Sequence, residues 1–376
     1  VMEASRVMWH QSTMVVVPSS TMAAGPCSRM PGVRIHLRSR IVRVVLRTAD
    51  RFPGHACRPG GLLLPHAFRR ADTAPDHRRR AIVDSLRALA PGVQVWGHRE
   101  EAPADAVEAM LAWSLKPGVL PAYPGLKLLC APSAGVDKLL AVPDLPAGLP
   151  VARTVDPQQH VEIAQYVVGT ALRHTRELDL FARQQQAGDW LRRPVRASAD
   201  CRVGILGLGE VGRFVAGAMQ AIGYPVAGWS RSAKSIAGLA THSGAEGLKQ
   251  LLSASDILVC ALPLTPETRD LLDRRTLSLL PRGAYFINVG RGEQVVEDDL
   301  LALLDEGHLA GAALDVLRDE PPQPGNKVWG HPKAFVTPHI AAQASADTVA
   351  RQCLENLRRL RAGEPLLNLV DVARGY

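Results

Sequence analysis

Val203-Gly204-Ile205-Leu206-Gly207-Leu208-Gly209-Glu210-Val211-Gly212 is the stretch that decides the fold of this chain. Its glycines form a G-x-G-x-x-G pattern directly after a short apolar run and before a segment with helical spacing. Gly207 permits a tight turn, Gly209 lets the backbone approach a pyrophosphate, and Gly212 allows close helix–strand packing. The free N–H groups at the start of the helix would receive the pyrophosphate. The pattern predicts a dinucleotide-binding turn that includes Glu210 and Val211.

Strands and helices are predicted to alternate from Arg202 onward. We expect strands at 203–207, 225–229, 257–262, 284–289, 311–315 and 335–337, and helices at 210–222, 246–253, 267–280, 297–306 and 343–362. Six strands separated by helices is the number expected of a doubly wound dinucleotide fold.

A second parallel sheet is predicted before this one, because residues 62–155 also alternate between strand and helix patterns. A single long helix with one apolar stripe is then expected from Gln159 to Gln186, ending at Gly188. Residues 1–60 show no sustained period, so we expect an extension that is disordered or outside the fold. The alternatives are a strand at Ile41–Leu46 or an Arg-rich transit peptide.

Composition favours a two-domain protein outside the membrane. The 376 residues exceed one ordinary core, and the longest apolar runs are far too short for a span. The net charge of +8 does not indicate nucleic-acid binding, because residues 1–80 hold 14 Lys/Arg and only 4 Asp/Glu. The 6 dispersed cysteines show no metal-ligand spacing, so we expect no metal site and a reducing, cytoplasmic location.

The end of the second strand reads Gly228-Trp229-Ser230-Arg231-Ser232. NAD-specific folds place an acidic residue there to bind the ribose 2′-hydroxyl. Ser230 stands in that place, whereas Arg231 and Lys234 supply positive charge for a 2′-phosphate. We therefore expect NADPH to be preferred over NADH, the alternative being that both cations are solvated loop residues.

Three more polar residues follow later strands, at the edge where doubly wound sheets bind ligands. Arg291 follows the strand at 284–289, Glu320 comes after the strand at 311–315, and His339 follows the last strand. Each alone is ordinary, because such residues are usually solvated or structural. Together they supply a cation, a carboxylate and a titratable acid.

The chain from about residue 62 to 376 resembles the D-isomer-specific 2-hydroxyacid dehydrogenase family, in particular its glyoxylate/hydroxypyruvate reductase A branch. The matching motifs stand in the family's order: Ser133-Ala134-Gly135-Val136-Asp137, GLGEVG, WSRS at 229–232, INVGRG at 287–292, LDV at 314–316, Glu320-Pro321, TPHIAA at 337–342 and the terminal VDVARGY. Gly290 stands where the family often has alanine, and we expect this departure to have no consequence.

The resemblance implies NADPH-dependent reduction of a small 2-ketoacid and assigns a catalytic set. Arg291 would bind the substrate carboxylate and polarise the keto oxygen, His339 would donate a proton, and Glu320 would orient the imidazole. Asp315 would hold the nicotinamide carboxamide. Further cofactor residues would be Ser230, Arg231, Ser232, Leu262, Pro263, Val289 and Ala341, and further substrate residues Ala134, Gly135, Val136 and Trp113. A core role for Trp113 is the alternative.

The resemblance also implies a discontinuous substrate domain, residues 61–155 and 344–376, with a dinucleotide domain at 156–343 inserted into it. The helix at 159–186 would help form a homodimer. Rival functions are a D-lactate or phosphoglycerate-type dehydrogenase, against which Ser230-Arg231 counts, and a nicotinamide-sensing corepressor. Formate dehydrogenase is disfavoured because it would have a Gln in place of Glu320, and a non-redox dinucleotide binder would not need all three catalytic residues. The preferred ketoacid stays open.

Overall fold

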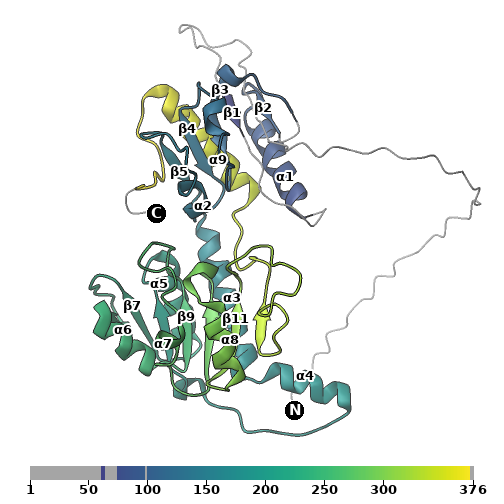
Figure 1. The fold of residues 1–376 in the computed structure, drawn as a ribbon, viewed down its shortest axis with the longest axis vertical. Helices are drawn as coiled ribbons and strands as arrows, with labels where there is room; N and C mark the ends of the chain where they lie inside the picture. The colour runs from purple at the N-terminus through teal and green to yellow at the C-terminus, as the bar shows by residue number, and fades with distance from the viewer. Residues whose placement is uncertain (1–60, 64–73, 98–99, 373–376) are drawn as a thin grey trace, which may run out of the picture. The chain divides into compact units, whose positions relative to one another are not determined.

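The computed structural model describes residues 61–63, 74–97 and 100–372 (Figure 1). The predictions for residues 1–60, including the strand at Ile41–Leu46, lie outside this part of the chain. Two parallel sheets with flanking helices are present, which confirms the predicted α/β class.

The larger sheet has seven strands in the order β12-β11-β10-β9-β6-β7-β8, all parallel. The strands are β6 (Val203–Leu206), β7 (Val226–Ser230), β8 (Ala240–Ser243), β9 (Ile257–Cys260), β10 (Ala284–Asn288), β11 (Leu309–Leu314) and β12 (Ala334–Val336). The strand order reverses between β6 and β9. Loops that leave the strands in opposite directions at such a point leave a crevice for ligands.

Helices connect these strands and cover both faces of the sheet. They are α3 (Pro157–Thr175), α4 (Leu178–Ala187), α5 (Glu210–Ala221), α6 (Gly244–Ser253), α7 (Arg274–Leu277) and α8 (Glu297–Asp305), with 3-10 turns η3 (Ser198–Asp200) and η4 (Gly292–Gln294).

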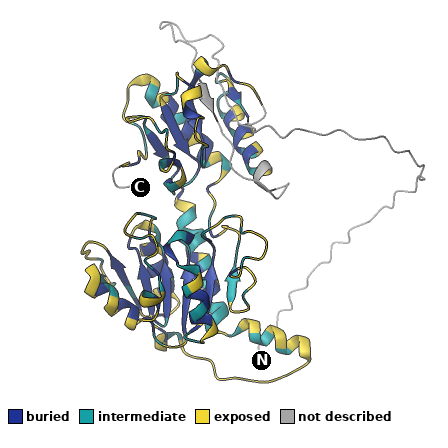
Figure 2. Ribbon diagram, viewed as in Figure 1, coloured by how far each residue is buried: buried dark blue, intermediate teal, exposed yellow. Residues whose placement is uncertain are grey.

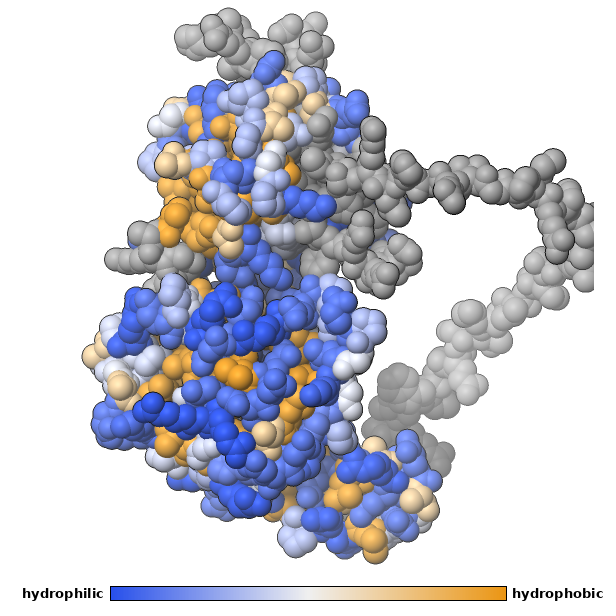
Figure 3. Space-filling model, in the orientation of Figure 1, coloured by the Kyte–Doolittle hydropathy of each residue, from blue (hydrophilic) through white to orange (hydrophobic). Residues whose placement is uncertain are grey.

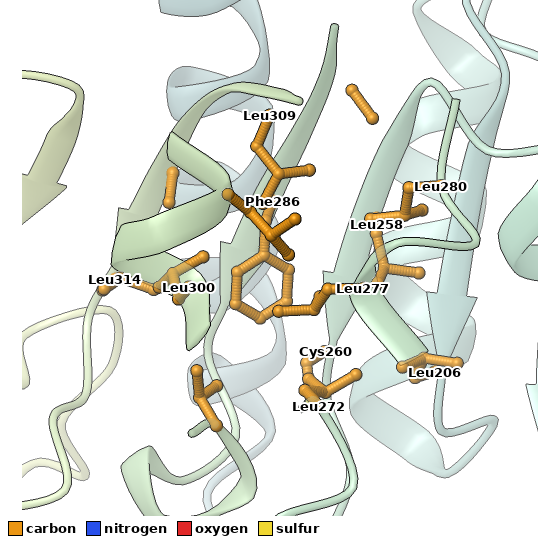
Figure 4. Close-up of a cluster of buried hydrophobic side chains, with 14 of the residues drawn as sticks. Leu206, Leu258, Cys260, Leu272, Leu277, Leu280, Phe286, Leu300, Leu309 and Leu314 are labelled. Atoms are coloured by element: carbon orange, nitrogen blue, oxygen red, sulfur yellow. The ribbon is translucent and has the colours of Figure 1, made fainter. Parts of the chain in front are cut away.

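Alternate residues of the central strands enter two separate cores. Leu258 of β9 and Phe286 of β10 belong to one core, in which the Phe286 ring lies among leucines (Figure 4). Their neighbours Ile257 and Ile287 point into the core under α3 and α5. Because both faces are covered, these strands are almost entirely apolar instead of alternating with polar residues. Figure 2 shows the strands of this sheet as largely buried.

The smaller sheet has the order β2-β1-β3-β4-β5, also all parallel. Its strands are β1 (Gly61–Leu63), β2 (Val95–Trp96), β3 (Val107–Leu111), β4 (Leu128–Ala131) and β5 (Val151–Arg153). The helices are α1 (Ala74–Leu89), α2 (Asp137–Leu140) and the C-terminal α9 (Ala346–Ala362), and the 3-10 turns are η1 (Ala104–Ala106) and η2 (Leu120–Ala122).

The C-terminal segment returns to this smaller sheet. Val349 and Leu357 of α9 pack in one core with Ile82 and Leu86 of α1. Beyond α9, the N–H of Val370 donates to the carbonyl of Val151, 2.8 Å away. The proposed boundaries at 155/156 and 343/344 stay a prediction.

The helix predicted over 159–186 is wrong in one respect, because it is two helices. Glu177 separates α3 from α4 with a left-handed φ of 50°. Such a conformation costs about 1–2 kcal/mol for a non-glycine residue. An ion pair between Arg173 and Asp179, at 2.8 Å, spans the break, and Glu177 itself pairs with Arg193 at 3.1 Å. No glycine or proline marks this position in the sequence.

The helix predicted over 267–280 is also wrong, since only α7 forms. Leucine spacing suggested a longer helix, but Leu272 instead forms a parallel bridge with Val295. Asp270 has a φ of 56°, and Asp273 caps α7 by accepting a bond from the N–H of Thr276. The leucines of this segment are buried by contacts with distant parts of the chain. Their spacing therefore does not indicate a helix.

Two strands were missed. The edge strand β8 is the polar Ala-Thr-His-Ser, and β5 has only three residues. Short or polar edge strands lack the apolar pattern on which strand prediction depends. The predicted six-stranded sheet therefore has a seventh strand.

Hydrophilic side chains surround smaller hydrophobic areas on the face drawn in Figure 3. In the described residues, none of the helices has both the length and the apolarity needed to cross a membrane. The same residues contain no cluster of three or more His, Cys, Asp or Glu able to hold a metal ion.

Candidate active site

The turn between β6 and α5 has the geometry that its glycines predict. Gly207 has a φ of 99°, and a Cβ there would lie 2.7 Å from the carbonyl oxygen of Ala261. A Cβ on Gly212 would lie 1.8 Å from the carbonyl oxygen of Gly207. Gly209 is the N-cap of α5, and a Cβ on it would meet nothing within 4 Å. The open backbone at Gly209 and the start of the helix fit a pyrophosphate.

The end of β7 lies next to this turn. Lys234 Nζ donates to the carbonyl of Leu208, 2.8 Å away, so the cation stands at the glycine turn. Ser230 is buried and its Oγ donates to the carbonyl of Ser232, whereas Arg231 is exposed. The pKa of Glu267 is lowered mainly by a hydrogen bond with Thr265, with a smaller effect from Arg231. This end of the site therefore carries two cations.

His339 and Glu320 form a pair. His339 Nδ1 lies 2.9 Å from Glu320 Oε2, and the N–H of Leu317 donates to Glu320 Oε1 at 3.1 Å. Lys138 Nζ stands 3.7 Å from the same Oε2 atom. Burial raises the pKa of Glu320, but the hydrogen bond and charge of His339, with Leu317 and Lys138, outweigh it and lower that pKa overall. Glu320 is thus held as an anion against the imidazole.

The loop that carries His339 is fixed by Asp315. Asp315 is buried, and its oxygens accept bonds from Thr337 Oγ1 at 2.6 Å and from the N–H groups of Ile340 and Ala341 at 2.8 Å each. Its own carbonyl accepts the N–H of His339 at 2.9 Å. Three of the four acceptor sites of this carboxylate are therefore taken by hydrogen bonds from the protein. One lone pair remains for a cofactor amide.

Tyr166 extends this network from α3. Its hydroxyl lies 2.8 Å from Thr337 Oγ1. Burial raises the pKa of Tyr166 to about 12, so the phenol stays neutral. Tyr166 and Thr337 were missed, because a Tyr in a helical stripe gives no signal that separates it from an ordinary core residue.

Arg291 faces the turn of the smaller sheet that precedes α2. Its Nε donates to Asp137 Oδ1 at 2.9 Å and its Nη1 to the carbonyl of Gly290 at 2.8 Å. A Cβ on Gly135 would lie 1.5 Å from Arg291 Nη2, so the guanidinium occupies the space that this glycine leaves. Among the described residues, the N–H groups of Ala134, Gly135 and Val136 have no acceptor. Free N–H groups opposite a guanidinium suit a carboxylate.

Asp137 and Lys138 were also missed. They stand side by side at the start of α2, one paired with Arg291 and the other with Glu320. An Asp at a helix start is expected for capping alone, so the sequence did not reveal these pairs.

The remaining predicted residues have mixed surroundings. Trp113 packs against the core of the smaller sheet, under the guanidinium of Arg78 at 5.4 Å from the ring centroid. Among the described residues, no hydrogen bond, ion pair or ring contact joins Trp113 to Arg291, Glu320 or His339. Leu262 is buried, and its carbonyl, like that of Pro263, accepts a bond from Gln294. Val289 follows β10 directly.

A side chain at Gly290 would be crowded, and the expectation that this glycine has no consequence stays a prediction. A Cβ there would lie 2.5 Å from Gln294 Oε1 and 2.9 Å from the carbonyl oxygen of Leu262. The buried amide of Gln294 fills the space that an alanine would need.

Comparison with known proteins agrees with the fold and the motifs. Residues 168–341 match the D-isomer specific 2-hydroxyacid dehydrogenase, NAD binding domain. Glyoxylate/hydroxypyruvate reductase A of Yersinia enterocolitica is 35% identical over 289 residues, which is 76% of this chain and 91% of the relative. The same reductase of Serratia proteamaculans is 37% identical over the same shares.

Solved structures are similar as well. A D-isomer specific 2-hydroxyacid dehydrogenase from Xanthobacter autotrophicus, in complex with NADPH and MES, has a TM-score of 0.73 at 39% identity, covering 85% of this chain and 100% of that one. An NADPH-dependent glyoxylate/hydroxypyruvate reductase from Sinorhizobium meliloti, with NADP and sulfate, has a TM-score of 0.72 at 33% identity, covering 81% and 98%.

Sheet topology, glycine turn and sequence similarity together define an NAD(P)-dependent oxidoreductase. The chain belongs to the D-isomer specific 2-hydroxyacid dehydrogenase family.

Proposed function

We propose that this enzyme reduces glyoxylate, hydroxypyruvate or a similarly small 2-ketoacid to the 2-hydroxyacid, with NADPH preferred over NADH. The observation that carries the proposal is the position of Arg291 opposite the free N–H groups of residues 134–136. The names of the two bacterial reductases support the choice of substrate.

The carboxylate of the substrate is assigned to Arg291 and the turn at Ala134, Gly135 and Val136. Arg291 Nη2 has no acceptor among the described residues, and it points at the backbone of this turn. A carboxylate between them would accept from the guanidinium on one side and from backbone N–H groups on the other. The same guanidinium would polarise the adjacent keto oxygen.

Proton transfer is assigned to His339. Its Nδ1 atom is engaged by Glu320, which leaves Nε2 to donate a proton to the keto oxygen. Glu320, whose pKa is lowered by its contacts with His339, Leu317 and Lys138, stays anionic and orients the ring. Bound NADPH supplies the hydride, from C4 of its nicotinamide. Reduction needs both, because a keto group that gains a hydride becomes an alkoxide and must be protonated.

The dinucleotide is assigned to the turn at Gly207, Gly209 and Gly212, together with Glu210 and Val211. Arg231 and Lys234 would bind the 2′-phosphate, with Ser230 and Ser232 beside them. Leu262, Pro263, Val289, Asp315 and Ala341 would line the nicotinamide end, and Trp113 would line the substrate pocket.

The test is the rate of NADPH and NADH oxidation with a panel of 2-ketoacids from glyoxylate to phenylpyruvate. We expect the highest kcat/KM for the smallest acids with NADPH. Preference for NADH or for pyruvate or a phosphorylated acid would favour a D-lactate or phosphoglycerate-type enzyme. Tight NADPH binding without turnover of any ketoacid would favour a nicotinamide-sensing binder.

The assembly is proposed to be a cytoplasmic homodimer in which α3 and α4 meet the second copy. α4 contains no buried residue, and Leu178 and Trp190 are 52% and 89% exposed. Apolar side chains so exposed suit a protein interface. Light scattering coupled to size-exclusion chromatography would test this, with Leu178→Asp expected to shift the mass toward the monomer. An unshifted dimer would place the interface elsewhere.

A further inference from the structure

Two fully buried amide side chains surround the backbone of Arg291. Asn288 is the last residue of β10, and Gln294 ends the 3-10 turn that follows Arg291. Both are 0% exposed. A buried amide that lost its partners would destabilise the fold, so the partners of these two are informative.

The two amides together hold both backbone groups of Arg291. Gln294 Oε1 accepts the N–H of Arg291 at 2.9 Å, and Asn288 Nδ2 donates to the carbonyl of Arg291 at 3.0 Å. Asn288 Oδ1 also accepts the N–H of Gly290 at 3.0 Å. The peptide that carries the guanidinium is therefore fixed from two sides.

Gln294 also reaches the neighbouring loop after β9. Its Nε2 donates to the carbonyls of Leu262 and Pro263, at 2.9 and 3.1 Å. Cys260 Sγ donates to Gln294 Oε1 at 3.2 Å. Burial raises the pKa of the Cys260 thiol to about 12, so it stays protonated and able to donate. All four hydrogen-bonding positions of Gln294 are thus occupied.

We infer that Gln294 and Asn288 are positioning residues: both fix the backbone at Arg291, and Gln294 also joins Arg291 to the loop at Leu262–Pro263. The inference rests on the proposed function, in which Arg291 binds the substrate carboxylate and this loop lines the nicotinamide end. Gly290 contributes to the same arrangement, because the absence of a side chain there leaves room for Gln294 Oε1. Neither amide contacts the substrate; both act by setting where the guanidinium stands.

Replacement by the isosteric acid tests each amide. Asn288→Asp puts an oxygen against the carbonyl of Arg291, and Gln294→Glu puts one against the carbonyls of Leu262 and Pro263. Both changes remove donors while keeping volume. A displacement of about 1 Å at a reacting centre lowers rates by on the order of 100-fold.

Asn356 offers a matched control in α9. It is also buried, and its amide also holds one backbone residue from both sides, accepting the N–H of Leu367 at 2.7 Å and donating to its carbonyl at 3.1 Å. Asn356→Asp therefore removes the same kind of bond far from Arg291 in the chain. This variant therefore measures the effect of lost stability on the kinetics while the guanidinium of Arg291 stays in place.

The measurements are KM and kcat for the ketoacid, the Kd for NADPH by fluorescence, and Tm. We expect Asn288→Asp and Gln294→Glu to raise KM for the ketoacid at least about tenfold. Their Tm should fall by about as much as that of Asn356→Asp. The control variant Asn356→Asp should keep the KM of the parent. We also expect the Kd of NADPH for Asn288→Asp to match the parent, since that amide does not touch the loop after β9. The KM of Gln294→Glu should fall toward the parent at low pH, where a protonated carboxyl regains a donor.

Equal KM values in the parent and in Asn288→Asp would overturn the inference, as would a KM increase of the same size in Asn356→Asp. If Gln294→Glu does not fold, Cys260→Ala takes its place, because it removes one donor to Gln294 and should raise KM by a smaller factor. Arg291→Lys separates the two proposals. If it raises KM while both amide variants do not, only this inference fails; if it leaves KM unchanged, the proposed role of Arg291 fails.

Discussion

Gly135→Ala should disable the proposed substrate site without unfolding the protein. The new Cβ would lie 1.5 Å from Arg291 Nη2 and 2.7 Å from Arg291 Cζ. Non-bonded atoms need about 3.5 Å, so the guanidinium would have to retreat by roughly 2 Å. The φ of Gly135 lies outside the left-handed region, so alanine adds no backbone strain.

The expected magnitude follows from this displacement. A shift of about 1 Å at a reacting centre lowers the rate by on the order of 100-fold, so kcat/KM should fall at least that far. This corresponds to about 2.7 kcal/mol of transition-state stabilisation. The fold should lose no more than about 0.5 kcal/mol, because the obstructing atoms are the end of a flexible, partly exposed side chain.

Initial rates of NADPH oxidation, with Tm and the Kd of NADPH, would measure these effects. Gly92→Ala is the matched control, since a Cβ on Gly92 meets nothing within 4 Å and its kinetics should be unchanged. In the Arg291→Lys background, Gly135→Ala should lower kcat/KM much less than in the parent, because the two changes act on one contact. A folded Gly135→Ala protein with kcat/KM within about threefold of the parent, against the 100-fold loss expected, would refute the argument.

Four further outcomes are expected. Arg291→Lys should raise KM for the ketoacid about 10- to 150-fold through loss of charge-assisted bonds of about 1.5–3 kcal/mol, with the Kd of NADPH unchanged; normal kinetics would contradict its role. Because the pKa of Glu320 is lowered in the folded state, its charge stabilises the fold above the ordinary value of 4.5, and that gain disappears as pH falls through the folded value. The Tm difference between the parent and Glu320→Gln should therefore shrink in acid, and a difference that stays constant with pH would contradict this role of the Glu320 charge. Arg231→Ala should weaken the binding of NADPH about 10- to 150-fold and leave the binding of NADH almost unaffected, which kcat/KM for both cofactors would show. A parent enzyme that prefers NADH would contradict the proposed role of Arg231. A chain that begins at Gly60 should keep its activity and its mass in solution, and loss of either would make the preceding residues part of the fold.

Local patterns were sufficient for the glycine turn and for most of the strands. Gly207 and Gly212 could be assigned from spacing alone, because their role is steric and depends on neighbours close in the sequence or on the adjoining strand. Arg291, Glu320 and His339 could be proposed together because parallel strands bring their carboxyl ends to one edge of a sheet. Every strand predicted from residue 203 onward is present, although its ends moved by one or two residues.

Contacts between residues far apart in the sequence decided the rest. The break at Glu177, the short helix α7 and the polar strand β8 depend on ion pairs, a strand bridge and an edge position that no local period records. The ion pair between Asp137 and Arg291 joins residues 154 positions apart. The amide of Gln294 forms hydrogen bonds with two different loops, at Arg291 and at Leu262. The sequence alone indicated which residues we propose to carry the chemistry. Only the tertiary structure decided what holds them in place, because a buried polar group is stable only where the fold brings it a partner.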